Sequence, residues 1–334
     1  MKHLTLRTVD GGALDISKIV LGTSSLHTVW RKLGEEGTFA YIDRYRELGG
    51  EIIDTGRTYG GETDQISFGL CESILSRYMK SRRCEGSLRI ITKGGFPDLD
   101  TRDLHMVRFR MTREAVLGDF YTSYDRLQKG PIDIYLLHRD APEKPVAYLM
   151  DLIHEIAQTG LVRVIGVSNW SLDRILEGNA YARSRGQTEI AVSELMWSYA
   201  YTDVVARRDA TLSIMNPALY RQYLEHPIPI ISFSSQARGL FSMLYRGAYR
   251  WEEVAEKNSW YAFPENEVRW HKIRTYCDRT GQNPAAVALA YLTSNPVACA
   301  PIVGCQTEAE LSDSLSDPDL TLTEAELRWF DDLG

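Results

Sequence analysis

Four side chains in the first half of the sequence have the types that proton transfer to a carbonyl group requires. Asp54 and Tyr59 belong to the segment EIIDTGRTYGG, Lys93 to ITKGG and His138 to LLHRD. A Tyr hydroxyl can donate a proton, but its ordinary pKa near ~10 makes it a slow acid unless its surroundings help. We expect Lys93 beside Tyr59 to lower the pKa of the phenol, and Asp54 to keep the ammonium charged and oriented.

Together these groups predict a proton donor aimed at the oxygen of a carbonyl that is being reduced. His138 would hydrogen-bond that oxygen and hold it near the Tyr59 hydroxyl, and the reverse reaction would use Tyr59 as a base toward an alcohol. Hydride must then move to or from the carbon, which implies a nicotinamide cofactor. Each of these residues by itself is more often structural than catalytic. An acid such as Asp54 usually lies in a loop, a lysine such as Lys93 on the surface, and a histidine such as His138 in a structural role. Their joint occurrence favours catalysis.

The elements that must position these residues are short apolar runs that alternate with helix-period segments. The eight strand candidates are Ile19–Leu21, Glu51–Asp54, Arg89–Thr92, Ile132–Leu137, Val162–Val167, Ile190–Leu195, Pro229–Phe233 and Ala298–Val303. The helix candidates include Phe39–Leu48, Gln65–Lys80, Thr112–Gln128, Pro145–Thr159, Leu172–Ser184 and Pro284–Ser294. Eight such units predict an α/β fold, most simply a (β/α)8 TIM barrel whose active site lies at the carboxyl ends of the strands.

Two further features bear on domain organisation. The turn signal VDGG between His3–Arg7 and Ala13–Ile16 predicts an N-terminal β-hairpin. No low-complexity linker or composition break divides the chain, so residues 1–334 are expected to form one domain. The connections from Tyr199 to His226 and from Ala237 to about Glu267 are expected to be long functional loops.

The composition is that of a globular protein, with 44% hydrophobic and 25% charged residues and a net charge of −7. This acidic balance argues against nucleic acid or an anionic membrane as a partner. Five cysteines without a CxxC spacing indicate reduced, buried thiols rather than a disulfide frame or a metal site. A cytoplasmic protein with a small-molecule partner is expected. The oligomeric state stays open.

The order of these motifs resembles the aldo-keto reductase family over nearly the whole chain. The segments that carry the resemblance are the N-terminal hairpin, IVLGT, DTGRTYG, ITKGG, LLHRD, GLVRVIGVSNW and PIVGCQTEAEL. The resemblance implies a (β/α)8 barrel, a catalytic tetrad of Asp54, Tyr59, Lys93 and His138, and NADPH or NADH bound without a Rossmann domain. In agreement, the sequence contains no G-x-G triplet.

The same resemblance implies a set of cofactor contacts. Those expected near the nicotinamide are Ser168, Asn169, Glu194 and Phe233; those near the pyrophosphate are Ser234, Gln236 and Arg238; and those near the adenosine are Gly304, Gln306 and Glu310. Gly22, Thr23 and Asp54 are expected to contact the cofactor as well.

Three positions depart from the family pattern. The adenosine segment GCQTEAELSDS contains Glu310 and no base, so we expect NADH to be tolerated or preferred, although Arg238 or another loop cation could restore NADPH binding. Glu194 replaces a more usual Gln, and an ionised carboxylate there would favour the oxidised, cationic nicotinamide. Arg57 replaces a smaller residue, and either binds an anionic or polyol substrate or forms a surface salt bridge.

Aromatic side chains offer further substrate contacts. Trp30, in the connection after the first strand, and Trp251, in the aromatic-rich segment after the seventh strand, are candidates for lining a pocket; packing of the loop is the alternative for Trp251.

Two other functions remain open at this point. One is a regulatory or sensor subunit of the same fold that binds cofactor and turns over slowly. The other is an aldolase that uses Lys93 to form a Schiff base.

Overall fold

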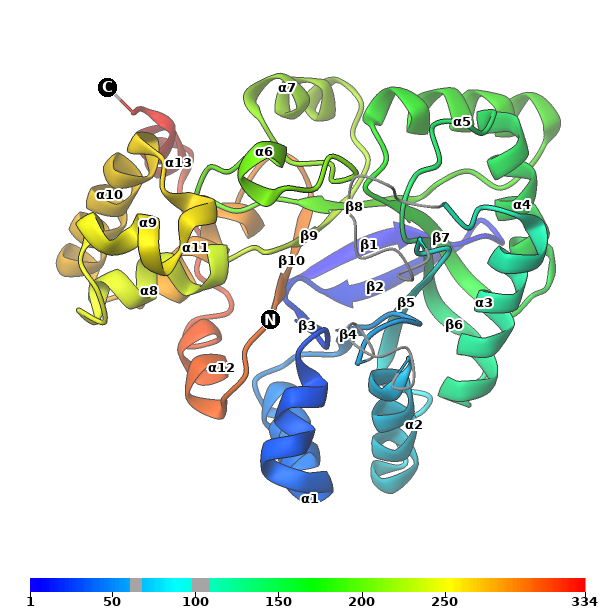
Figure 1. The fold of residues 1–334 in the computed structure, drawn as a ribbon, viewed down its shortest axis with the longest axis horizontal. Helices are drawn as coiled ribbons and strands as arrows, with labels where there is room; N and C mark the ends of the chain where they lie inside the picture. Colours follow the sequence, from blue (N-terminus) through cyan, green and yellow to red (C-terminus); the bar gives the residue numbers. More distant parts are fainter. Residues whose placement is uncertain (61–67, 98–108, 334) are drawn as a thin grey trace.

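The computed structural model of the protein describes residues 1–60, 68–97 and 109–333, and a closed barrel of parallel strands lies at its centre (Figure 1). The predicted (β/α)8 fold with an N-terminal hairpin is confirmed. The strands follow one another around the barrel in chain order: β3 (Val20–Gly22), β4 (Ile52–Asp54), β5 (Arg89–Gly94), β6 (Ile132–Leu137), β7 (Val162–Ser168), β8 (Val192–Met196), β9 (Ile230–Phe233) and β10 (Cys299–Val303).

These strands are nearly continuous apolar runs because both of their faces are buried, as is typical of parallel sheets covered by helices. All six residues of β6 are buried, and so are all five of β8. The register brings polar residues near the carboxyl ends of neighbouring strands. Asp54 pairs with Ile91 of β5, two residues before Lys93, and Ser168 of β7 pairs with Glu194 of β8.

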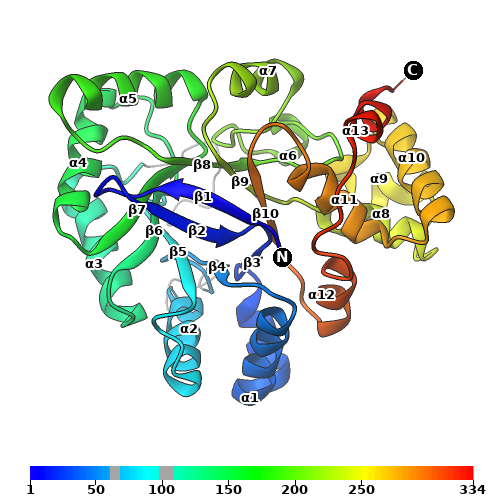
Figure 2. The same ribbon diagram turned by 180° about the vertical axis from the view of Figure 1, so that it is seen from behind.

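The hairpin of β1 (His3–Arg7) and β2 (Ala13–Ser17) covers the opposite end of the barrel (Figure 2). Every second side chain is apolar, and Leu4, Leu6, Leu14 and Ile16 are buried in one cluster with residues of the barrel strands. The amide of Val9 donates to the carbonyl of Arg163 near the start of β7, at 2.8 Å. The hairpin therefore closes the amino ends of the strands, and an active site must open at their carboxyl ends.

Helices surround the barrel, and several begin with a side-chain cap. Asn283 accepts a hydrogen bond from Ala285 N at 2.9 Å while Pro284 occupies the first turn, as the sequence predicts. The α-helices are α1 (Leu26–Glu47), α2 (Leu70–Arg82), α3 (Arg113–Leu127), α4 (Val146–Gln158), α5 (Leu172–Arg185), α6 (Val204–Arg207), α7 (Pro217–Glu225), α8 (Leu240–Tyr245), α9 (Val254–Lys257), α10 (Pro264–Thr280), α11 (Pro284–Thr293), α12 (Glu308–Ser314) and α13 (Glu324–Asp331). Single 3-10 turns are η2 (Ala237–Gly239), η3 (Trp251–Glu253) and η4 (Ser259–Tyr261).

Three expectations about the connections need correction. The segments predicted as long loops carry helices: α6 and α7 lie in the first, and η2, α8, η3, α9, η4 and the start of α10 in the second. These helices are short or weakly amphipathic, so their periodicity is faint in the sequence. The helix after β3 begins at Leu26, so Trp30 belongs to α1 and not to a loop. The helix predicted from Gln65 is described only from Leu70, and residues 65–67 lie outside the described residues.

The cysteines and the helices also bear on the environment of the protein. All five cysteines lie in the described part of the chain, where they are buried and form no disulfide. Among the helices that the structure describes, none is long and apolar enough to cross a membrane.

Candidate active site

The predicted tetrad comes together at the carboxyl ends of β4, β5 and β6. Lys93 is fully buried, and its Nζ donates to the Tyr59 hydroxyl at 3.2 Å and to the carbonyl of Thr55 at 3.0 Å. The same ammonium forms a hydrogen-bonded ion pair with Asp54. The His138 ring lies 5.9 Å from the Tyr59 ring, centroid to centroid. Because Thr55 and Asp54 both hold Lys93, the ammonium has a defined position beside the phenol.

The electrostatics of Tyr59 differ from the sequence-based expectation. Burial raises the pKa of Tyr59 well above its ordinary value, and the nearby charge of Lys93 only partly offsets this effect. The negative charges of Asp54 and Glu194 act in the same direction as burial. Lys93 does lower the pKa of the phenol, as the sequence predicts, but burial and the two carboxylates outweigh this effect. Tyr59 is a protonated phenol at neutral pH, and this is the state that a proton donor needs.

Lys93 stays charged in spite of its burial. Burial alone would lower the pKa of Lys93, but Asp54, Glu194 and Tyr59 together raise it above the ordinary value. An ammonium with a raised pKa is a poor nucleophile, since Schiff-base chemistry needs a neutral amine. The aldolase alternative therefore loses its physical basis.

Glu194 brings a second carboxyl group to the same ammonium. Its Oε2 lies 3.5 Å from Nζ of Lys93, and its Oε1 accepts a hydrogen bond from Ser168 at 3.3 Å. Burial, together with the charge of Asp54, raises the pKa of Glu194 to about 8, against the opposing effect of Lys93. One ammonium does not neutralise two buried carboxylates, so Glu194 is mostly protonated at neutral pH. The expectation of an ionised Glu194 therefore needs correction: it carries its charge only above pH about 8.

His138 is neutral. Burial, followed by the charges of Arg139 and Lys93, lowers the pKa of His138 well below its ordinary value. Its ring packs 4.7 Å from the Phe96 ring, and Nδ1 is buried without a hydrogen-bond partner among the residues that the structure describes. A neutral imidazole next to Tyr59 can bind a carbonyl oxygen through its N–H without competing for the proton.

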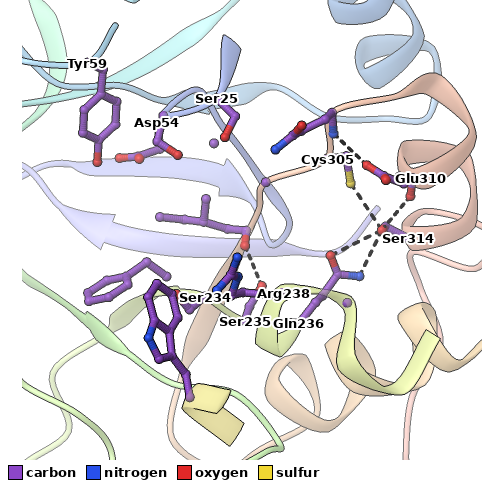
Figure 3. A pocket seen from close by; sticks show the side chains of 18 of the residues that line it. Ser25, Asp54, Tyr59, Ser234, Ser235, Gln236, Arg238, Cys305, Glu310 and Ser314 are labelled. Atoms are coloured by element: carbon purple, nitrogen blue, oxygen red, sulfur yellow. Dashed lines mark hydrogen bonds between the residues drawn. The ribbon is translucent and has the colours of Figure 1, made fainter. Parts of the chain in front are cut away.

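A cavity of about 1060 Å³ opens above these residues. Figure 3 shows Tyr59 and Asp54 at one side of it and Glu310 and Ser314 at the other. Of the residues proposed to contact cofactor, those that line the cavity are Gly22, Asp54, Asn169, Glu194, Phe233, Ser234, Gln236, Arg238, Gly304, Gln306 and Glu310. The sequence thus placed most of these contacts on one continuous surface.

Two of the proposed contacts lie behind that surface. The hydroxyl of Thr23 is buried and donates to the carbonyl of Asp54 at 2.9 Å. Ser168 is also buried, and its Oγ accepts a hydrogen bond from the Asn169 amide at 2.9 Å. Direct contact of Thr23 and Ser168 with a ligand stays a prediction, and the structure gives both a supporting position.

The segment after β9 has a strained backbone. Ser234, Ala237 and Arg238 have φ values of 54°, 51° and 56°, in the left-handed region that residues with a Cβ rarely adopt. Such conformations cost on the order of 1–3 kcal/mol each and concentrate at ligand-binding segments. The Gln236 amide also donates to Ser314 Oγ at 2.9 Å, so this segment is joined to the far side of the cavity.

The three residues proposed for substrate binding do not appear among those that line the cavity in the described part of the chain. Nε of Arg57 lies 2.8 Å from Oδ1 of Asp119, a buried residue of α3. Trp30 packs on α1 against Phe39, 6.4 Å between ring centroids. Trp251, in η3, is half-buried and packs against the hydrophobic core. Their roles toward substrate stay predictions that this geometry does not favour.

Other residues that line the cavity were not singled out in the sequence. Among them are Ser25, His27, Phe96, Arg139, Arg207, Asp209, Arg246, Trp260 and Asp313. Arg139 belongs to the LLHRD motif, directly after His138, so the sequence could have identified it as a cavity residue. Arg207, Arg246 and Trp260 belong to the connections predicted as loops, where spacing carries no signal about orientation.

The raised pKa of Glu194 makes stability depend on pH. In the folded state Glu194 keeps its proton up to pH about 8, whereas unfolding restores a pKa near 4.5. The folded state therefore binds more protons in this window, and its stability falls as pH rises. We expect Glu194→Gln to remove this loss, and so to gain up to about 5 kcal/mol relative to the natural protein between pH 4.5 and pH about 8. Urea unfolding of both proteins at pH 4.5 and at pH about 8 measures this difference in stability.

The exposed residue Glu177 of α5 supplies a control with the same chemical change. Glu177→Gln should leave the pH dependence of unfolding as it is. If Glu194→Gln follows the natural protein at every pH, then Glu194 ionises normally in the folded state.

Comparison with known proteins agrees with this geometry. The family model described as Aldo/keto reductase family matches residues 18–334. The norsolorinic acid reductase stcV of Emericella nidulans is 26% identical and aligns with 99% of this chain and 81% of its own length. The aryl-alcohol dehydrogenase [NADP(+)] of Phanerodontia chrysosporium is 22% identical, covering 96% of this chain and 83% of its own. The chain therefore belongs to the aldo/keto reductase family of oxidoreductases.

Proposed function

We propose that the protein is an NAD(P)(H)-dependent oxidoreductase that interconverts an aldehyde, ketone or sugar carbonyl and the corresponding alcohol. The observation that carries the proposal is a protonated Tyr59 that faces the cavity and accepts a hydrogen bond of 3.2 Å from the buried ammonium of Lys93. The curated relatives named above carry reductase and dehydrogenase names, which supports both directions of the same chemistry.

The cavity suits a long, polar cofactor. It reaches from Tyr59 to Glu310 (Figure 3), and it contains a buried carboxyl oxygen, Oε2 of Glu194, that accepts no hydrogen bond from described residues. We propose that Asn169, Glu194 and Phe233 hold the nicotinamide, with Ser168 behind them. Ser234, Gln236 and Arg238 would hold the pyrophosphate, and Gly304, Gln306 and Glu310 the adenosine. When bound, the cofactor supplies or accepts the hydride.

The protein's own residues control the proton. In reduction, Tyr59 donates its hydroxyl proton to the carbonyl oxygen, and Lys93 stabilises the phenolate that results through its charge at 3.2 Å. Asp54 keeps Lys93 in place during this step. The neutral His138 donates a hydrogen bond to the same oxygen and orients it. In oxidation the roles reverse, and Tyr59 takes the alcohol proton.

The charges at the adenosine side favour NADH. Glu310 accepts a hydrogen bond from Gln306 N at 2.8 Å, and Arg246, which also lines the cavity, pairs with Asp313 at 3.4 Å. This side of the cavity is thus lined by two carboxylates, Glu310 and Asp313, and by one arginine that is already paired, so an added 2′-phosphate would meet net negative charge. We propose that NADH is tolerated or preferred.

Incubation of the purified protein with NADH or NADPH and a panel of neutral aldehydes tests this function. We expect the reduced-nicotinamide absorbance to fall with every turnover, and NADH to bind at least as tightly as NADPH. Tight cofactor binding without turnover on any aldehyde or alcohol would instead favour the sensor subunit. An NADPH dissociation constant about tenfold below that of NADH, equal to about 1.4 kcal/mol, would contradict the charge argument.

Glu194 adds a pH effect to cofactor binding. Because the pKa of its carboxyl group is about 8, we propose that Glu194 favours binding of the oxidised nicotinamide only above that pH. The ratio of the affinities for oxidised and reduced cofactor should then rise with pH in the natural protein and stay flat in Glu194→Gln.

A further inference from the structure

A second group of charged residues lines the cavity away from the tetrad. Arg207 ends α6, Arg238 belongs to η2 and Trp260 to η4. The guanidinium carbon of Arg207 lies 3.6 Å from the centroid of the Trp260 ring, and that of Arg238 lies 4.4 Å from the same centroid. One indole therefore brings two cations to the wall of the cavity. Two positive charges at one ring repel each other, and a bound anion would offset this repulsion.

Arg207, whose charge contacts the ring of Trp260, forms no ion pair or hydrogen bond with the described residues. Its Nε and Nη1 atoms are buried and form no hydrogen bond there. Burial, and secondarily the charge of Arg238, lowers the pKa of Arg207, so the guanidinium is held at an energetic cost. Buried charged donors without acceptors are expensive, on the order of a few kcal/mol. A residue of this kind in a cavity indicates a ligand that supplies the acceptors.

The carboxylate closest in sequence is already engaged elsewhere. Asp209 lies 3.7 Å from Nη2 of Arg139, and it accepts hydrogen bonds from the amide and hydroxyl of Thr211 at 2.9 and 2.5 Å. It raises the pKa of Arg207 only as a weaker, opposing influence. Arg57, the other arginine considered for an anionic substrate, is bound to Asp119.

The position of Arg207 indicates that its ligand is the substrate and not the adenosine part of the cofactor. Through Asp209, its segment contacts Arg139, which directly follows His138. Arg139 in turn lies over Phe96, 5.1 Å from the ring centroid, and Phe96 packs against the His138 ring at 4.7 Å. These contacts join α6 to the catalytic half of the cavity. Figure 3 shows Glu310 and Ser314 across the cavity from Tyr59, on the half that we assign to adenosine.

We propose that Arg207 binds a carboxylate on the substrate, so that the enzyme prefers carbonyl compounds that also carry a carboxylic acid group. The inference rests on the proposed function and names the substrate class of the same site. A carboxylate is the expected anion because its two oxygens match the planar donors Nε and Nη of a guanidinium. A single negative charge also matches Arg207, which among the described arginines that line the cavity is the one with buried donor atoms that form no hydrogen bond.

The test compares aldehydes that differ only in charge. Para- and meta-formylbenzoate are paired with para- and meta-formylbenzamide, which are neutral and of nearly equal size. We expect at least one formylbenzoate to have a kcat/KM about tenfold above that of its amide, as a charged hydrogen bond implies. Arg207→Gln should bring this ratio to about one, and Arg207→Lys should keep part of it. Arg208→Gln, a change of the exposed neighbouring residue, should leave the ratio unchanged.

Binding measurements keep the inference separate from turnover. Calorimetric titration of the cofactor-loaded protein with each formylbenzoate and its amide reports the same preference even if no aldehyde is reduced. A failure of the proposed function would abolish turnover of all aldehydes and leave this preference. Equal binding of acids and amides to the natural protein, or a preference that survives in Arg207→Gln, would overturn the inference. So would a tenfold loss of NADH affinity in Arg207→Gln with an unchanged acid-to-amide ratio.

Discussion

Tyr59→Phe is expected to lower kcat for aldehyde reduction by about 10²–10⁴-fold, the usual contribution of a positioned general acid. The phenyl ring keeps the shape of the cavity wall and loses the hydroxyl that accepts the 3.2 Å hydrogen bond from Lys93. Because the missing group donates its proton only as the carbonyl is reduced, the effect should fall on kcat. Steady-state kinetics with a neutral aldehyde measure this, and fluorescence titration with NADH reports whether the cofactor site survives.

Tyr78→Phe is the matched control for this change. Tyr78 is a buried residue of α2 whose hydroxyl donates to Asp43 at 2.7 Å, and it is not among the cavity-lining residues of the described chain. Its loss removes a comparable hydrogen bond without touching the site. A kcat for Tyr59→Phe within about tenfold of that of Tyr78→Phe would mean that another group donates the proton.

Lys93→Met is expected to reduce both stability and activity. The ammonium is the cation shared by Asp54 and Glu194, which are themselves buried. Its removal leaves two carboxyl groups facing each other without compensation, and breaking a buried ion pair from one side costs about 3–5 kcal/mol. The loss should be largest above the Glu194 pKa of about 8, where the second carboxylate would also be ionised. Urea unfolding on both sides of that pH measures the difference.

Another buried lysine separates the two effects. Lys129 pairs with Asp133 at 2.7 Å, and neither residue is among those lining the cavity in the described chain. Lys129→Met should lower stability while the protein that remains folded keeps its kcat. Adding Asp54→Asn to Lys93→Met should recover part of the stability and none of the activity. Equal stability of Lys93→Met and the natural protein above pH about 8 would show that Lys93 does not stabilise the ionised forms of Asp54 and Glu194.

Much of the barrel was predictable because its strands are local apolar runs. The sequence located β6 at its observed bounds and the other barrel strands within a few residues, since parallel strands buried on both faces leave a continuous apolar signal. Short helices such as α6 and α9 leave no comparable signal, because four residues are too few to show a period. Their segments appeared in the sequence as loops, which removed Arg207 from consideration.

By itself, the sequence determined which residues meet at the candidate active site. Asp54, Lys93 and His138 end or follow parallel strands, and the carboxyl ends of such strands share one rim of the barrel. The tertiary structure decided their charge states and the partners of the arginines. Burial beside Asp54 keeps the proton on Glu194, Asp119 binds Arg57, and the short helix α6 brings Arg207 to Trp260. These outcomes depend on distance and burial between segments far apart in the chain, and neither residue type nor spacing contains that information.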